Sequence, residues 1–223
     1  MNRFATLAVT AMALAVAAPP AQAGLGVGAK AGTLGLGLEF TRSLGPRVNA
    51  RVGINYYDGY EYTTTEDGID YTAEFGLFSA SLLGDFHPVP LLGLRASAGV
   101  LFNGNSLELV GAPAEATVEI GGETYTTTEV GEVRGEVGFG SFAPYAGIGW
   151  GNASSSLVAI SIDVGIVFQG APEVELSATG PIAENELFRE ELIQEQENLA
   201  ESIENFKFYP VVSLGLSFKL PML

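Results

Sequence analysis

The side chains that could act as catalysts are few, and their spacing does not favour a reaction. Hydrolysis by an activated nucleophile needs Ser or Asp close to a His that takes up the proton. The chain has a single histidine, His87, which lies in a predicted turn beside Asp85 and Pro88. A histidine in such a turn is typical of a surface or boundary position rather than of a general base. We therefore assign no catalytic residue and expect a protein that is not an enzyme.

Sites for a metal ion, a phosphate or a cofactor are not indicated either. Segment 67–70 reads Asp-Gly-Ile-Asp and lacks the remaining oxygen ligands of a calcium loop, so it is predicted to be a turn. Residues 24–37 are rich in glycine but lack the Lys-Ser or Lys-Thr pair of a phosphate loop. The chain has no cysteine, which excludes disulfides and thiolate metal sites, and its net charge of −16 disfavours binding to nucleic acid. We expect no metal, no cofactor and no nucleic-acid partner.

A second group of polar and charged side chains shares a pattern, because each lies at a polar alternate position of a predicted strand. These side chains are Asn49, Arg51, Asn55, Arg95, Asn103, Arg134, Glu136, Asp163 and Lys219. Ionised groups are costly in contact with lipid, but they can pair with one another in a narrow interior. We expect these residues to line the lumen of a closed sheet and largely to fill it.

The strands that must position these residues have apolar side chains at every second residue, the period of a strand with one apolar and one polar face. The clearest example is 158–168, in which Asp163 is the only charge. The predicted strands are 25–40, 48–56, 71–83, 92–102, 130–139, 143–150, 158–168 and 212–220. The apolar parity changes within 25–40, which predicts a β-bulge near Gly32-Thr33, and no faces are assigned to 71–83.

The apolar faces of these strands are almost free of charge, and aromatic residues such as Tyr56, Phe102, Trp150 and Phe168 gather where the strands end. A water-soluble sandwich also alternates, but it places polar residues outside and apolar ones inside. The opposite arrangement, with aromatic girdles at two lipid boundaries, is typical of membrane barrels. The sequence therefore predicts an all-β fold, an antiparallel up-and-down transmembrane β-barrel of about eight strands.

The N-terminal segment has the features of an export peptide. Arg3 is followed by the uncharged apolar run 4–18, and Ala21-Gln22-Ala23 matches a small-x-small cleavage site. The apolar run is too short for a membrane-spanning helix. We expect 1–23 to be a cleaved signal peptide and 24–223 to form one barrel domain.

Two long connections, 57–70 and 104–129, carry the same pentapeptide, Tyr-Thr-Thr-Thr-Glu, at 62–66 and at 125–129. Thr and Tyr favour strands, so we expect both connections to extend the barrel wall as hairpins. The second is expected to turn at Gly121-Gly122. A shared adhesive motif is the alternative interpretation.

Segment 181–205 differs from the rest because it is rich in Glu and has apolar residues at near-helical spacing. We expect it to be one acidic amphipathic helix, inserted before the last strand. It is interpreted as a solvated helix on the rim, with a lid or plug on one mouth of the barrel as the alternative.

The last strand resembles the final strand that outer-membrane barrels present to the barrel-assembly machinery. The pattern is carried by Ser213, Gly215, Phe218 and Leu220, although 221–223 follow where such families usually end on an aromatic residue. The mature chain as a whole resembles the small eight-stranded outer-membrane barrels, the group of the outer-membrane protein A transmembrane domain and the outer-membrane protein W type. This resemblance implies the outer membrane of a Gram-negative bacterium, with outer-membrane lipid and lipopolysaccharide and, during biogenesis, the assembly machinery as partners.

The expected function is structural or surface-interactive, through acidic, threonine-rich loops for which the sequence names no extracellular ligand. A narrow channel for small solutes or ions, lined by the charged residues above, is a second hypothesis, and a lipid-modifying enzyme is a third. The topology contains an inconsistency, because eight strands counted in this way put both termini on the side of the long connections. Either a strand is miscounted, with 173–179 as a candidate extra strand, or some long connections lie inside.

Overall fold

The computed structural model describes residues 24–66, 69–113, 117–120, 122–153 and 157–221. The predicted signal peptide, residues 1–23, lies outside this part of the chain, as do Asp67 and Gly68 of the predicted turn. Among the described residues, no helix combines the length and the hydropathy needed to cross a membrane.

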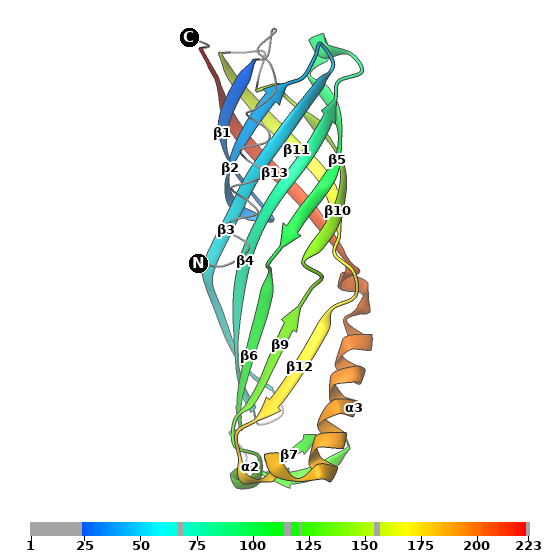
Figure 1. Cartoon of the computed structure of the whole chain (residues 1–223). Helices are drawn as coiled ribbons and strands as arrows, with labels where there is room; N and C mark the ends of the chain where they lie inside the picture. The colour runs from blue at the N-terminus through cyan, green and yellow to red at the C-terminus, as the bar shows by residue number, and fades with distance from the viewer. Residues whose placement is uncertain (1–23, 67–68, 114–116, 121, 154–156, 222–223) are drawn as a thin grey trace.

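Eight antiparallel strands close into a ring (Figure 1). Its members, in order, are β1 (Leu25–Gly32), β2 (Gly35–Ser43), β3 (Val48–Glu66), β4 (Ile69–Phe86), β5 (Leu94–Asn103), β10 (Phe142–Trp150), β11 (Val158–Phe168) and β13 (Phe208–Leu220). Each strand pairs with the next in this order, and β13 pairs with β1. Closure gives every strand of the ring two hydrogen-bonded neighbours, so the ring itself has no edge strand.

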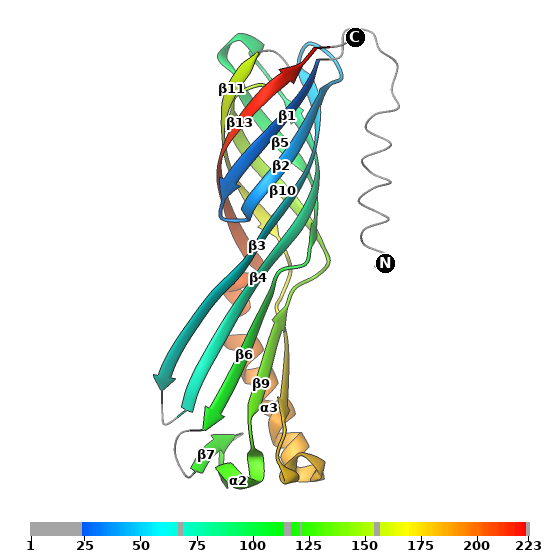
Figure 2. The same cartoon turned by 90° about the vertical axis from the view of Figure 1, so that its left-hand side faces the viewer.

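Five strands continue the sheet beyond one end of the ring, in the order β3, β4, β6 (Ser106–Pro113), β9 (Val133–Gly138) and β12 (Glu173–Ala178). β6 continues the line of β5, since both pair with β4 (Figure 2). β9 pairs with β6 and β12 pairs with β9, so these two strands take the places that β10 and β11 have in the ring. We call this part of the sheet, outward from Tyr57 of β3 and Gly76 of β4, the extension.

Helices cover the far end and one side of the extension (Figure 1). The helix α3 begins where Asn185 accepts backbone hydrogen bonds from Leu187 at 2.9 Å and Phe188 at 3.5 Å, which is the geometry of an N-cap. Its Phe188 is buried against Ile120 and Val130 in a small core separate from the ring. The remaining elements are η1 (Pro90–Leu92), β7 (Thr117–Ile120), β8 (Glu123–Thr126), α2 (Thr127–Val130), η2 (Pro181–Glu184), α3 (Glu186–Ser202) and η3 (Glu204–Lys207).

Two predicted strands differ from the observed ones. Segment 25–40 is not one strand with a bulge but two strands, β1 and β2, joined by a turn at Thr33-Leu34, and Gly35 takes a φ of 93° directly after that turn. Segment 130–139 contains β9, which belongs to the extension and not to the ring. The ring still has eight strands, because segment 25–40 supplies two strands, β1 and β2, in place of one, while β9 lies outside the ring.

The split at Thr33-Leu34 also removes the topological inconsistency. Leu25 lies opposite Leu220, so the two ends of the described chain lie at the same end of the ring (Figure 2). The connections 44–47 and 87–93 and residues 151–153 lie at this same end, whereas the extension lies at the other. The candidate extra strand at 173–179 exists as β12, again within the extension.

The two faces of the ring differ sharply in polarity. Large apolar side chains on its outer face are mostly two-fifths to two-thirds exposed: Leu36, Leu38, Ile54, Tyr56, Phe78, Leu82, Leu94, Val100, Ile148, Trp150, Ile160, Ile162, Val164, Ile166, Val212, Leu214 and Leu216. The alternate positions of the same strands point inward and hold buried polar groups such as Asn55, Ser79 and Ser97. This is the reverse of the arrangement in a water-soluble β-protein.

Candidate functional site

Six charged side chains from six different strands meet inside the ring. They are Lys30 of β1, Glu39 of β2, Arg51 of β3, Asp85 of β4, Arg95 of β5 and Asp163 of β11. Each lies at an inward position of its strand, and none of these side chains is more than 14% exposed. We call this group the ionic cluster. It contains three cations and three anions, so its formal charge is balanced.

Arg95 and Asp163 form a contact with two hydrogen bonds inside the lumen. Arg95 Nη2 donates to both carboxylate oxygens of Asp163, at 2.8 and 2.9 Å. Between them in the sheet lies Gly149, which is the register partner of both residues. A Cβ atom at Gly149 would lie 2.8 Å from Asp163 Oδ1 and 3.0 Å from Arg95 Nε. The missing side chain therefore makes room for the ion pair.

Arg51 connects the other members of the ionic cluster. Its Nε lies 2.7 Å from Asp85 Oδ2, its Nη1 donates to Glu39 Oε2 at 3.2 Å, and its Nη2 donates to Asp163 Oδ1 at 3.3 Å. Glu39 also accepts from Lys30 Nζ at 3.2 Å. The guanidinium thus lies among three carboxylates, and this matches the planar, multidentate pairing for which Arg is suited.

Neutral groups add hydrogen bonds to the ionic cluster. Ser97 Oγ donates to Asp85 Oδ1 at 2.6 Å and accepts from Arg51 Nη2 at 3.2 Å. Arg95 Nη1 donates to the carbonyl of Gly151, in the connection after β10. Buried charges are tolerated when they are paired and hydrogen-bonded. Arg51 Nε and Arg95 Nε make no hydrogen bond within the described part of the chain, but every charge of the ionic cluster has an oppositely charged partner, and the pair of Arg51 with Asp163 joins strands on opposite sides of the ring.

An apolar layer lies next to the ionic cluster, toward the extension. Its buried members are Leu34, Leu83, Leu101, Ala143, Tyr145, Val167 and Val211, with Tyr209 packed against them. Between this layer and the ionic cluster lies a cavity of about 20 Å³, lined by groups of both. Such a volume holds about one water molecule. The lumen at this level is therefore filled by side chains, as eight strands allow.

The other predicted lumen residues with amide side chains also lie inside the ring. Asn49 Nδ2 donates to Asn152 Oδ1 at 3.2 Å, Asn55 Nδ2 donates to Ser79 Oγ at 2.9 Å, and Asn103 Nδ2 donates to Gln169 Oε1 at 3.3 Å. All three asparagines are buried. Together with Arg51, Arg95 and Asp163, these make six predicted residues that the structure places within the ring.

Three predicted lumen residues lie elsewhere. Arg134 and Glu136 belong to β9 and are exposed on the extension, where Arg134 Nη2 pairs with Glu132 Oε2 at 3.1 Å. The prediction was wrong because an extension strand has the same alternation as a ring strand. Lys219 is also exposed, because it lies one residue from the end of β13, at the mouth of the ring. The proposed assembly residues Ser213, Gly215, Phe218 and Leu220 lie in β13, with Phe218 outward.

The sequence interpretation missed half of the ionic cluster. Lys30 and Glu39 lay in a segment read as one strand with changing parity, so their inward positions were not recognised. Asp85 was assigned to a turn, although β4 continues to Phe86. His87, expected at a surface or boundary, is buried at the end of the ring with 1% exposure. Correct strand ends would have placed Lys30, Glu39 and Asp85 by parity alone.

No protein-family model and no curated protein matches the chain. Two solved structures from Acinetobacter baumannii are similar to it. CarO2 has 23% identity and a TM-score of 0.60, and CarO has 21% identity and a TM-score of 0.57; each match covers 88% of this chain and 98% of the other. A major outer membrane protein from Thermus thermophilus has 13% identity over 89% of this chain and 99% of that one, with a TM-score of 0.45.

At these identities the likeness is one of fold. The predicted resemblance to small bacterial outer-membrane β-barrels is confirmed at that level. The described ring and its extension together account for the match, since most of this chain and nearly all of each A. baumannii protein are covered.

Proposed function

We propose that this chain, with the fold of small outer-membrane β-barrels, is an integral outer-membrane protein of a Gram-negative bacterium. In this proposal the ring spans the lipid, the ionic cluster and the apolar layer close its lumen, and the extension is presented at the cell surface for interaction. The protein would be a scaffold rather than an enzyme. Outer-membrane lipid and lipopolysaccharide would surround the ring, and the barrel-assembly machinery would insert it.

The observation that carries the proposal is the inverted polarity of the ring. Apolar side chains such as Leu214 and Ile148 are 58% and 68% exposed on its outside, whereas Arg51, Asp85 and Arg95 are at most 5% exposed inside. Removing apolar surface from water is worth roughly 25 cal/mol per Å². A ring with this exterior is stable when hydrocarbon covers it, and its charges avoid lipid by facing inward.

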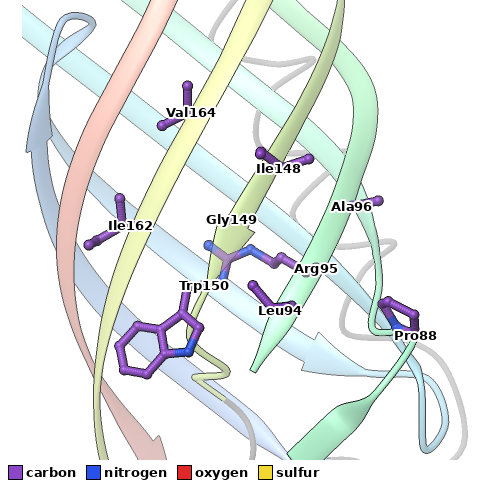
Figure 3. A pocket seen from close by; sticks show the side chains of 9 residues that line it. All are labelled: Pro88, Leu94, Arg95, Ala96, Ile148, Gly149, Trp150, Ile162 and Val164. Atoms are coloured by element: carbon purple, nitrogen blue, oxygen red, sulfur yellow. The ribbon is translucent and has the colours of Figure 1, made fainter. Parts of the chain in front are cut away.

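The outer wall also contains a groove suited to hydrocarbon. Its volume is about 500 Å³, and it crosses β5, β10 and β11 near the tight connections (Figure 3). It is lined by Pro88, Leu94, Arg95, Ala96, Ile148, Gly149, Trp150, Ile162 and Val164, and the guanidinium of Arg95 is paired with Asp163 inside the ring. Trp150 Nε1 donates to the Leu92 carbonyl at 2.9 Å, so its only donor is satisfied and the rest of the indole can lie in the apolar part of the boundary.

The orientation follows from the connections. Outer-membrane barrels have short turns on the periplasmic side and long loops outside. The connections 44–47 and 87–93 lie at the end where Leu25 and Leu220 meet, whereas the long extension, together with the turn at Thr33-Leu34, lies at the opposite end. We therefore assign the termini to the periplasm and the extension to the cell surface.

Gel mobility of the purified, mature chain tests the barrel. An unboiled sample in detergent is expected to run at a different apparent size from a boiled one, because a closed ring resists unfolding by the detergent of the gel. A sample without this shift would contradict the proposal.

Planar-bilayer recording tests the closed lumen. The wild-type chain is expected to give no steady conductance, because the ionic cluster and the apolar layer fill the ring. Steady openings that change in Arg95→Ala would contradict the scaffold proposal and support the channel hypothesis.

A further inference from the structure

β3 leaves one side of the extension unpaired. Within the ring it pairs with β2 as far as Tyr56, and beyond that residue only β4 pairs with it among the described strands. The opposite side of the extension is β12, beside which α3 runs (Figure 1). There Gln196 Nε2 donates to the Val174 carbonyl at 3.4 Å. One side of the extension therefore has a helix along it, and the other is a free strand edge.

The free edge lacks two residues that commonly block strand addition. Lys and Pro are typical guards of an exposed edge, and segment 57–66 contains neither. The register of β3 with β4 shifts between Tyr57 and Tyr60, but from Tyr60 to Glu66 the pairing is unbroken. Tyr and Thr, which favour the extended conformation, fill most of this stretch. A regular strand edge is thus offered from Tyr60 to Glu66.

One face of the extension carries a row of glutamates in register. The Cα partners are Glu61 with Glu74, Glu74 with Glu108, Glu108 with Glu136, and Glu136 with Glu175. Each of the five extension strands contributes one of these residues, and all five are exposed. We call them the glutamate row. Like charges directly opposite one another weaken a sheet, and the row ends at the free edge with Glu61.

Around Tyr62, the other face of the same edge is aromatic. Tyr62 is 53% exposed and lies opposite Ala73, and Phe75, on the same face of β4, is 38% exposed. Since neighbouring residues of a strand point to opposite faces, Glu61 and Tyr62 present the two faces side by side. A strand added to β3 would meet carboxylates on one face and aromatic surface on the other.

We propose that the edge of β3 from Tyr60 to Glu66 docks an extended segment of a partner protein as an additional strand. Backbone hydrogen bonds would join it to β3, which is the established mode of strand addition. Its residue beside Glu61 would be Lys or Arg, and its residues beside Tyr62 would be apolar. A second copy of this chain does not fit, because its own glutamate row would face that of the first copy at Glu61.

The inference rests on the proposed function for the position of this edge outside the cell. The probe is a synthetic peptide of alternating Lys and Val, added to the full mature chain folded in detergent micelles. Isothermal titration calorimetry measures its affinity, and amide hydrogen exchange locates it. We expect binding and slower exchange of the amides of residues 60–66, with little change in β12.

Two controls separate strand addition from simple charge attraction. The same peptide with N-methyl groups on alternate amides keeps its charge but loses edge pairing, so it is expected to bind at least about tenfold more weakly. Glu61→Lys is expected to lower the affinity about fivefold, whereas Glu175→Lys, at the other end of the glutamate row, makes the same change in net charge with little effect.

Three results would overturn the proposal. They are equal binding of the N-methylated peptide, equal effects of Glu61→Lys and Glu175→Lys, or self-association of the chain through the exchange-protected residues 60–66. The gel-mobility shift of the ring is measured separately on every variant. Loss of peptide binding with the shift intact is therefore distinct from failure of the barrel itself.

Discussion

At the scale of residues, the interior of the ring depends on a few charges with shared partners. Asp163 accepts from Arg95 at 2.8 Å and from Arg51 at 3.3 Å, so both cations compensate the same carboxylate. Removing one partner of a buried pair leaves a charge that the interior cannot solvate. The ionic cluster is thus expected to be far more sensitive to substitution than exposed pairs on the extension.

Arg95→Ala is expected to lower the free energy of unfolding by about 3–5 kcal/mol, because Asp163 loses its shortest ion pair in a buried setting. Arg134→Ala is the matched control. Its partner Glu132 is exposed, so the change is expected to stay within about 0.5 kcal/mol. Urea titration of the folded chain in detergent, followed by gel mobility, measures both. Equal effects of the two substitutions would contradict the assigned role of the ionic cluster.

Tyr125 gives the extension a dependence on alkaline pH. Its hydroxyl donates a hydrogen bond to Glu191 of α3, and this bond raises the pKa of Tyr125 to about 12. A pKa above its unfolded value gives a stabilisation that is complete below about pH 10. That stabilisation is lost as the pH rises through the folded pKa of about 12.

Hydrogen exchange in β8 and α3 is therefore expected to quicken between about pH 10 and 12 relative to a variant that lacks the hydroxyl. Tyr125→Phe is that variant, and it should lose this part of the pH dependence. Absorbance at the tyrosinate band, compared between the two proteins, reports the titration itself. A Tyr125 that ionises like a free tyrosine would contradict the contact with Glu191.

At the scale of elements, alternation identified strands well but gave their ends and partners poorly. The turn at Thr33-Leu34 was read as a bulge because it lacks the Asn-Gly or Asp-Gly signal of a tight hairpin. The inward positions of 48–56, 92–102 and 158–168 were correctly separated from the outward ones, since one parity was polar throughout. This is why Arg51, Arg95 and Asp163 could be predicted, whereas Lys30, Glu39 and Asp85 could not.

The repeated pentapeptide shows the limit of local sequence. Residues 62–66 are extended within β3, where β4 pairs with them. At 125–129 the same residues end β8 and begin α2, and Glu129 Oε2 accepts from the backbone and side chain of Thr126 in a capping box. The residues of the capping box lie within the pentapeptide and are therefore present in both copies. At 62–66 the pairing with β4 keeps the same residues extended, so the surroundings decide the conformation.

Because the glutamate row places like charges opposite one another, we expect that removing a charge from its middle stabilises the extension. Glu108→Gln relieves repulsion from Glu74 and Glu136, which lie directly opposite on both sides, and is expected to slow hydrogen exchange in β4, β6 and β9 about two- to fivefold. Glu123→Gln, in β8, makes the same change in net charge away from the row. Added salt screens the repulsion, so it should reduce the difference in hydrogen-exchange rate between wild type and Glu108→Gln. Faster exchange in Glu108→Gln would contradict the repulsion.

At the scale of the whole molecule, the connections 44–47 and 87–93 and both described ends lie opposite the extension. The proposed orientation can be tested with single cysteines, because the chain has none of its own. A membrane-impermeant maleimide on intact cells is expected to label Thr124→Cys in β8 and not Gly45→Cys in a tight connection. After the outer membrane is permeabilised, both should react. Labelling of Gly45→Cys alone on intact cells would invert the assignment.

The pairing of β1 with β13 has a consequence for biogenesis. These two strands are the first and last of the ring, and they align from Leu25 with Leu220 to Gly32 with Ser213. The seam therefore cannot form until β13 has been delivered. In a chain that ends before β13, β1 and β11 would each lack a hydrogen-bonded neighbour on one side. Closure of the ring therefore requires a chain that includes β13, and a product truncated before β13 cannot form the closed ring.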